Sequence, residues 1–241
     1  MMQNRKQIKI PYIFFAVLIV LLVVSALISG RKTWAVGDVD LVLLLALDVS
    51  ASIDAREFQL MREGLANALS SVQVAQAVGA GKSGAIAISV MQWSGFQEQE
   101  VKIKWTRVSS REDLLNLSGE VRRMPRRYNG GATDIGGAIK FSRELVNSAP
   151  FVTVRKTIDI AGDGPNNVNR SPAIERDITV NSGITINGLA VIGEAVALVD
   201  FYTRFVIGGN LAFVEDARDY DSFETAMHRK LLREIGSLYL F

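Results

Sequence analysis

The chain has 241 residues, of which 49% are hydrophobic and 22% are charged, a composition typical of a globular protein with a sizeable buried core. Its net charge of +2 is too small to indicate nucleic acid or an acidic polymer as a partner. The chain contains no cysteine, which excludes disulfides, thiol catalysis and thiolate metal sites.

The N-terminal segment has the features of a targeting sequence. Arg5, Lys6 and Lys9 precede an uncharged apolar run over residues 10–29, and about twenty apolar residues are enough to cross a bilayer as a helix. We therefore expect residues 1–35 to be a signal peptide or an N-terminal membrane anchor, and residues 36–241 to form the folded domain. In both cases the domain is exported, either to the periplasm or to the outer side of the cytoplasmic membrane.

The domain begins with a strand and a helix. The segment VDLVLLLALD, residues 39–48, is apolar on both faces, as is typical of a central strand in a parallel sheet. A helix follows directly, since Asp54 and Glu57 have the spacing of a capping box. Residues 84–95 are apolar and residues 100–106 alternate between apolar and charged, which predicts a hairpin.

Strands and helices alternate through the rest of the chain. The apolar periodicity predicts helices at about 109–123, 134–148, 171–181, 196–206 and 219–236, and strands at 154–163, 183–193 and 212–214. This order predicts an α/β fold with a doubly wound, mostly parallel sheet, one antiparallel edge hairpin and helices on both faces. Such sheets bind their ligands beyond the carboxyl ends of the strands.

Three segments at those strand ends combine glycines with oxygen-bearing side chains: DVSAS at 48–52, NGGATDIGGA at 129–138 and AGDGPNN at 161–167. Alternate residues of an extended segment point the same way, so the Asp and two Ser side chains of the first can face one point. Carboxylates and hydroxyls without imidazole or thiol are hard donors that favour Mg²⁺ or Mn²⁺. The sequence therefore predicts one divalent-cation site, formed by Asp48, Ser50, Ser52, Thr133 and Asp163.

This combination resembles the metal-ion-dependent adhesion site of von Willebrand factor type A domains, whose signature is Asp-x-Ser-x-Ser, a distant Thr and a distant Asp. The resemblance covers about residues 38–238 and includes the predicted order of elements. It implies that Ser50 and Ser52 bind the metal directly, as does Thr133 in the ligand-competent state. It also implies that Asp48 and Asp163 act largely through waters.

The functional implication is an exported bacterial protein-binding module. Neutral hydroxyls only partly neutralise the cation, which should then attract an acidic side chain from a protein partner. In related domains the last helix shifts to couple metal coordination to affinity, and here that helix would be about 220–235.

Simpler interpretations exist for each motif. Ser50 and Ser52 could cap the following helix, residues 163–165 could form an ordinary turn, and Asp134 could cap the next helix. The arginines of RRMPRRY, residues 122–128, are typical of a solvated helix end, although they could also bind an acidic partner or an anionic lipid.

Two alternative functions stay open. An aspartyl phosphohydrolase would use Asp48 as a nucleophile beside Mg²⁺, but such enzymes usually carry a second Asp where this chain has Ser50. A structural envelope module would need no metal. We expect a binding protein rather than an enzyme.

Overall fold

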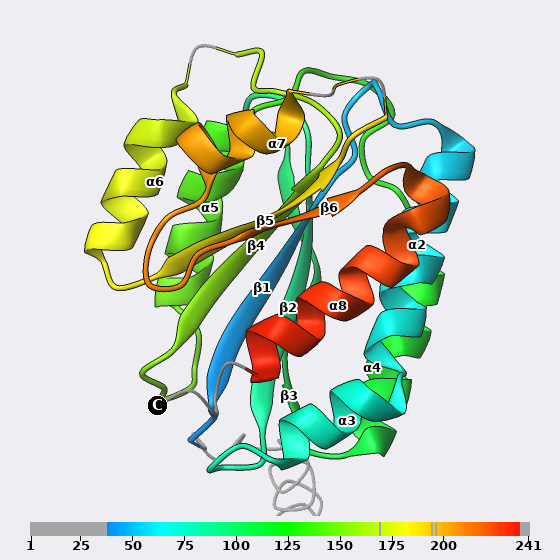
Figure 1. Cartoon of the computed structure of the whole chain (residues 1–241), viewed down its shortest axis with the longest axis vertical. Coiled ribbons are helices and arrows are strands. Elements are labelled where there is room, and N and C mark those ends of the chain that lie inside the picture. The colour runs from blue at the N-terminus through cyan, green and yellow to red at the C-terminus, as the bar shows by residue number, and fades with distance from the viewer. Residues whose placement is uncertain (1–37, 169, 194, 196, 237–241) are drawn as a thin grey trace, which may run out of the picture. The chain divides into compact units, whose positions relative to one another are not determined.

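One sheet organises the domain in the computed structural model, with strand order β3-β2-β1-β4-β5-β6 (Figure 1). The structure describes residues 38–168, 170–193, 195 and 197–236, so the expected leader or anchor at residues 1–35 lies outside it. The strands are β1 (Leu41–Asp48), β2 (Ile86–Trp93), β3 (Gln99–Val108), β4 (Lys156–Gly162), β5 (Thr185–Val191) and β6 (Val214–Ala217). All neighbouring pairs are parallel except β2 with β3, which form the expected antiparallel edge. The predicted fold class is confirmed.

Helices cover both faces of the sheet. They are α2 (Ala55–Leu69), α3 (Val72–Gly79), α4 (Arg111–Arg123), α5 (Ile135–Asn147), α6 (Pro172–Asn181), α7 (Leu198–Phe201) and α8 (Phe223–Gly236). Figure 1 shows α2, α3, α4 and α8 on one face, and α5, α6 and α7 on the other. Each layer encloses its own cluster of buried apolar side chains.

Strand β1 divides these two cores. Its leucines at 41, 43, 45 and 47 belong to the cluster beneath α2 and α8, and Val42, Leu44 and Ala46 belong to the opposite one. Every residue of β1 is buried, and burying one leucine side chain stabilises the fold by about 2 kcal/mol. This firmly fixed strand carries Asp48 at its carboxyl end.

The start of α2 is fixed by Asp54. Asp54 Oδ1 accepts a hydrogen bond of 2.8 Å from the Glu57 amide, and Glu57 Oε2 accepts one of 2.8 Å from the Asp54 amide. This capping box satisfies amides that have no partner within the helix. Ser50 and Ser52 therefore do not cap α2.

Four elements differ from the sequence prediction. The helix expected at 196–206 divides into α7 and a π-helical turn, η1 (Tyr202–Val206). The strand expected at 212–214 begins at Val214, because β6 takes its position from pairing with Gly188–Val191 of β5. The last helix is preceded by a separate 3₁₀ turn, η2 (Tyr220–Ser222), and the short helix α3 was not predicted.

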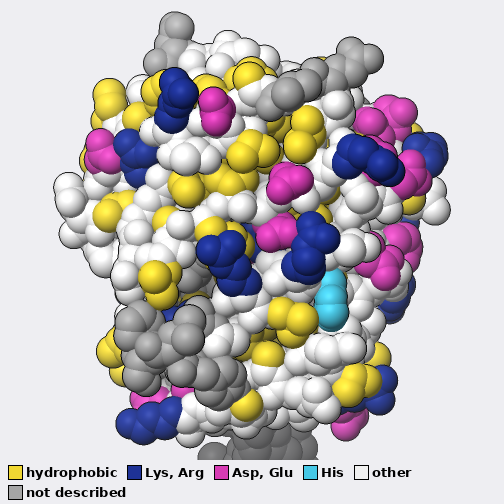
Figure 2. Space-filling model, viewed as in Figure 1, with side chains coloured by type: hydrophobic (Ala, Val, Ile, Leu, Met, Phe, Trp, Pro, Cys, Tyr) yellow, Lys and Arg dark blue, Asp and Glu magenta, His cyan; other side chains and the backbone are white. Residues whose placement is uncertain are grey.

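The surface does not carry a block of one charge on the face seen in Figure 2, where basic and acidic side chains are interspersed. This agrees with the small net charge of the chain. Among the helices that the structure describes, none has both the length and the apolar character needed to cross a bilayer.

Candidate metal centre

The five side chains predicted to bind a cation lie at the carboxyl edge of the sheet. Asp48 ends β1, and Asp163 directly follows β4, the strand that pairs with β1 in parallel. Ser50 and Ser52 lie in the turn between β1 and α2, and Thr133 lies two residues before α5 begins. Segments far apart in the sequence thus meet at one edge.

Hydrogen bonds connect these side chains to one another. Thr133 Oγ1 donates to Ser50 Oγ at 3.4 Å, the two serine hydroxyls are 3.3 Å apart, and Ser52 Oγ donates to Asp163 Oδ1 at 2.7 Å. Asp48 Oδ1 accepts a hydrogen bond of 2.7 Å from the Ser50 amide. The oxygens of five side chains therefore form one continuous cluster.

The second carboxylate oxygen of Asp48 is unusual. Oδ2 is buried and has no hydrogen-bond partner among the described residues, whereas buried polar atoms nearly always have one. Burial, and to a lesser extent the charge of Asp163, raise the pKa of Asp48 to about 7, although Ser50 and Arg126 oppose this shift. A cation at this edge would compensate the buried negative charge of the Asp48 carboxylate.

Two buried tyrosines surround the same carboxylates. A Cβ on Gly162 would lie 2.8 Å from Tyr202 Oη and 2.9 Å from Asp48 Oδ2, so both oxygens approach the backbone of β4 where only glycine fits. The hydroxyls of Tyr202 and Tyr220 are buried and have no hydrogen-bond partner in the described part of the chain. Burial raises the pKa of each, and the charges of Asp48 and Asp163 raise it further. Sequence reasoning missed both tyrosines, because neither falls in a motif.

Arg126 holds the loop that contains Ser50. Its Nη2 donates hydrogen bonds of 3.0 Å to the carbonyls of Val49 and Ser50, and its Nε donates one of 2.7 Å to the Tyr128 carbonyl. The prediction that this arginine belongs to a solvated helix end was wrong, since its guanidinium connects two loops of the site. These bonds satisfy carbonyls that lie outside regular secondary structure, and the Ser50 carbonyl also accepts a hydrogen bond of 3.1 Å from the Ile53 amide.

The loop before α5 is fixed from two sides. The Thr133 amide donates a hydrogen bond of 2.8 Å to Asn167 Oδ1, and the Asn167 amide donates one of 3.1 Å to the Thr133 carbonyl. Gly131 has φ of +134°, and a Cβ there would meet Glu98 Oε2 at 2.6 Å. Asp134 caps α5, because its Oδ1 accepts a hydrogen bond of 2.8 Å from the Gly137 amide. The simpler interpretation of Asp134 as a helix cap is therefore confirmed.

The donor set decides which metals fit. Within the described residues no group of three or more His, Cys, Asp and Glu side chains is arranged to hold a metal, so an ion here would use hydroxyls together with two carboxylates. Hard oxygen donors of this kind suit Mg²⁺ and Mn²⁺. The unpaired Asp48 Oδ2 and this chemistry both fit a divalent cation.

The chain has the fold of von Willebrand factor type A domains. Residues 38–239 match the family described as "Protein of unknown function (DUF1194)", and the chain belongs to this family. No curated protein sequence matches the chain.

Solved structures with the same fold come from several organisms. Proximal thread matrix protein 1 from the mussel byssus is 20% identical with a TM-score of 0.59, the match covering 83% of this chain and 48% of that one. A structure of the same protein with a zinc-occupied MIDAS motif has a TM-score of 0.58, at the same identity and coverage. The chain thus spans about half the length of the mussel protein.

Two bacterial structures are also similar. A von Willebrand factor type A protein from Catenulispora acidiphila is 17% identical with a TM-score of 0.54, covering 82% of this chain and 43% of that one. The vWF domain of the pilus tip protein Mfa5 from Porphyromonas gingivalis is 12% identical with a TM-score of 0.55, covering 80% and 94%. Identities this low show a shared fold and do not show a shared function.

Proposed function

We propose that this chain is an exported module that binds a protein partner through a divalent cation. Ser50, Ser52 and Thr133 would hold Mg²⁺ or Mn²⁺ directly, and Asp48 and Asp163 would hold it largely through waters. The observation that carries the proposal is the continuous cluster of five oxygen-bearing side chains around a buried carboxylate oxygen that has no described partner.

The cation would attract an acidic side chain. Three of the five side chains are neutral hydroxyls, which leave the cation's charge only partly neutralised, and Mg²⁺ prefers six oxygen ligands. A carboxylate from a partner would complete the ligand set and the charge balance. The zinc-occupied MIDAS motif of the mussel protein supports a divalent cation in such a fold, and hard donors favour Mg²⁺ or Mn²⁺ here.

Binding fits the site better than catalysis does. In an aspartyl phosphohydrolase Asp48 would attack phosphorus, which requires that a substrate reach its carboxylate. Asp48 is 0% exposed, and its Oδ1 already accepts a hydrogen bond from the Ser50 amide. We therefore propose that the chain is not an enzyme.

Export follows from the N-terminal sequence. The positive residues before the apolar run at 10–29 would keep the N-terminus in the cytoplasm. The domain would then lie in the periplasm, or at the outer side of the cytoplasmic membrane if the run stays attached as an anchor. A pilus adhesin and the vWF domain of a pilus tip protein among the similar folds support an extracytoplasmic role.

Calorimetric titration of Mg²⁺ and Mn²⁺ into the chelator-treated full chain in detergent tests the proposal. We expect saturable binding by the parent and none by Asp48→Ala or Thr133→Ala. Asp200→Ala is the matched control, since Asp200 is an exposed carboxylate with a side chain 75% accessible, and it should bind like the parent. Absence of binding by the parent would contradict the metal site.

A further inference from the structure

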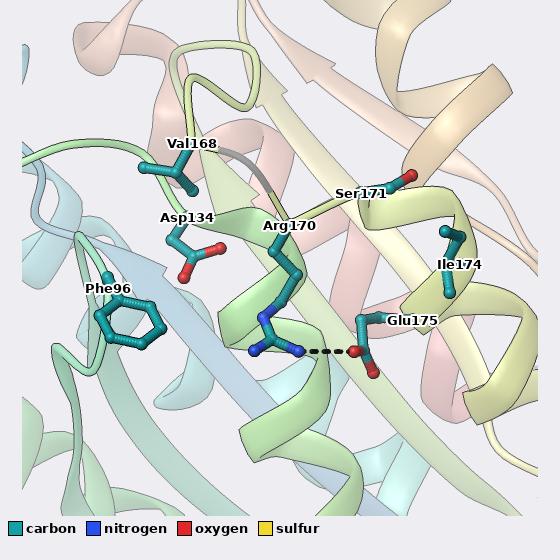
Figure 3. A pocket seen from close by; sticks show the side chains of 7 residues that line it. All are labelled: Phe96, Asp134, Val168, Arg170, Ser171, Ile174 and Glu175. Atoms are coloured by element: carbon teal, nitrogen blue, oxygen red, sulfur yellow. Dashed lines mark hydrogen bonds and ion pairs between the residues drawn. The ribbon is translucent and has the colours of Figure 1, made fainter.

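Figure 3 shows the side chains around a hollow of about 550 Å³. It is lined by Phe96, Asp134, Val168, Arg170, Ser171, Ile174 and Glu175. Binding pockets for small molecules and side chains commonly fall between about 300 and 1,000 Å³. The hollow is therefore large enough for a large side chain of a partner.

The hollow and the metal centre are built from the same two loops. Asp134, which lines the hollow, directly follows Thr133. Val168 and Arg170 follow Asn167, which exchanges hydrogen bonds with Thr133. A ligand bound to a cation at Thr133 would thus lie next to the entrance of the hollow.

The rim of the hollow is apolar and open to solvent. Phe96 is 65% exposed and Ile174 is 62% exposed, and Figure 3 shows them on opposite sides of the hollow. Exposed apolar side chains are normal when they are scattered singly. Figure 3 shows Arg170 between these two side chains and Val168 on the side of Phe96, so an apolar group placed in the hollow could contact apolar side chains on both sides.

Charged side chains of both signs line the hollow. Arg143 Nη1 and Arg170 Nη1 lie 2.9 Å and 2.8 Å from the two carboxylate oxygens of Glu175, so two arginines share one carboxylate. The Asp134 carboxylate is engaged by the amide end of α5, where the helix dipole favours a negative charge. The two arginines are thus balanced by the carboxylates of Glu175 and Asp134, and the negative charge of a ligand would be attracted by the cation and not by the hollow.

We propose that this hollow is the specificity site of the metal-dependent interaction, and that it receives a large apolar side chain of a protein segment whose acidic residue binds the cation. The inference rests on the proposed function. The partner is thus an acidic segment with an aromatic or long aliphatic residue close to the acidic one. The metal supplies attraction for any carboxylate, and the hollow selects among partners.

Selection of displayed random peptides tests this proposal. The library is bound to the full chain in Mg²⁺ and eluted with chelator, so that only metal-dependent peptides are recovered. We expect the recovered peptides to share an acidic residue and a large apolar residue at a fixed spacing. Peptides with an acidic residue and no apolar preference, or no recovered peptide from a chain that binds Mg²⁺ in the titration, would overturn the proposal.

Variants of the rim give the second measurement. Phe96→Ala and Ile174→Ser should each weaken binding of a recovered peptide about tenfold, with Mg²⁺ affinity and melting temperature unchanged because both side chains are exposed. Leu115→Ala is the control, since Leu115 is a 46% exposed leucine on α4. Unchanged peptide affinity in both rim variants would overturn only the role of the hollow in selecting partners. Absence of Mg²⁺ binding by the parent would overturn the proposed function itself.

Discussion

The hydroxyl of Tyr202 and the Oδ2 atom of Asp48 both lie within 2.9 Å of the position that a Cβ on Gly162 would occupy. Both are buried, and neither has a hydrogen-bond partner in the part of the chain that the structure describes. A buried hydroxyl and a buried carboxylate oxygen thus lie near the same glycine, and we expect the Tyr202 hydroxyl to help orient Asp48.

Removal of this hydroxyl should weaken the metal site. We expect Tyr202→Phe to lower Mg²⁺ affinity about tenfold, the smaller end of the range for groups that orient metal ligands, and to change the melting temperature of the metal-free chain little. Titration calorimetry and thermal unfolding in chelator measure the two effects. Tyr128→Phe is the matched control, and equal Mg²⁺ affinities for Tyr202→Phe and the parent would show that Asp48 needs no donor from Tyr202.

Arg126 should be required for the shape of the loop that holds Ser50. Arg126→Met removes hydrogen bonds to the carbonyls of Val49 and Ser50. Hydrogen bonds from a charged donor contribute about 1.5–3 kcal/mol, so the unfolding free energy should fall by about 2 kcal/mol and Mg²⁺ affinity should fall with it. Arg123→Met, at an exposed position three residues earlier, should leave both unchanged, and a loss of similar size there would remove any special role for Arg126.

Much of the fold, and the meeting of the candidate side chains at one edge, could be predicted because each signal lies in a short stretch of sequence. The apolar run of β1 predicts a strand buried on both faces, and it is one. Asp54 and Glu57 predict a capping box, and it forms. The position of Asp163 follows from the rule that parallel strands end at one edge, which holds for β1 and β4. Thr133 follows α4 and not a strand, and its hydrogen bonds with Asn167 and Ser50 place it at this edge.

The parts that could not be predicted depend on contacts distant in sequence. In the sequence Arg126 is one of several arginines near the end of a predicted helix. Only the folded chain shows that it donates hydrogen bonds to the carbonyls of Val49 and Ser50. Tyr202 and Tyr220 acquire their place beside Asp48 through the packing of η1 and η2. The start of β6 depends on its partner β5 and on the hydrogen bond from the Phe213 amide to Asn187.

Glu175 should make stability depend on pH in the acid range. Burial acts to raise its pKa, but hydrogen bonds from Arg143 and Arg170 outweigh this and hold the pKa below its ordinary value of 4.5. The pairing therefore stabilises the fold above pH 4.5, and this contribution is lost as the pH falls through the lower pKa of the folded state.

Urea unfolding of the parent and of Glu175→Gln at several pH values measures this contribution. The difference in unfolding free energy should be largest at neutral pH and should shrink steadily below pH 4.5. Glu144→Gln is the control, because its side chain is 63% exposed and lies 4.0 Å from Lys140. A difference between the parent and Glu175→Gln that does not vary with pH would contradict the charge pairing.

Lys230 fastens α8 to the sheet through a buried ion pair. Its Nζ lies 2.8 Å from Asp159 Oδ1 on β4 and 2.6 Å from Glu234 Oε1 one turn further along α8. Lys230 is 0% exposed, and the two carboxylates outweigh the effect of burial and raise its pKa. The helix that the resemblance expected to shift is therefore held by a charged contact at the centre of the molecule.

Loss of this lysine should be severely destabilising. Lys230→Met leaves the buried Asp159 carboxylate without the lysine beside it, and removal of one partner of a buried pair costs about 3–5 kcal/mol. Denaturant unfolding measures the loss, with Lys140→Met as the exposed control. Addition of Asp159→Asn to Lys230→Met should restore part of the stability, because it removes a buried charge that has lost its partner. A double variant no more stable than Lys230→Met would show that packing of the lysine stem, and not charge, holds α8 in place.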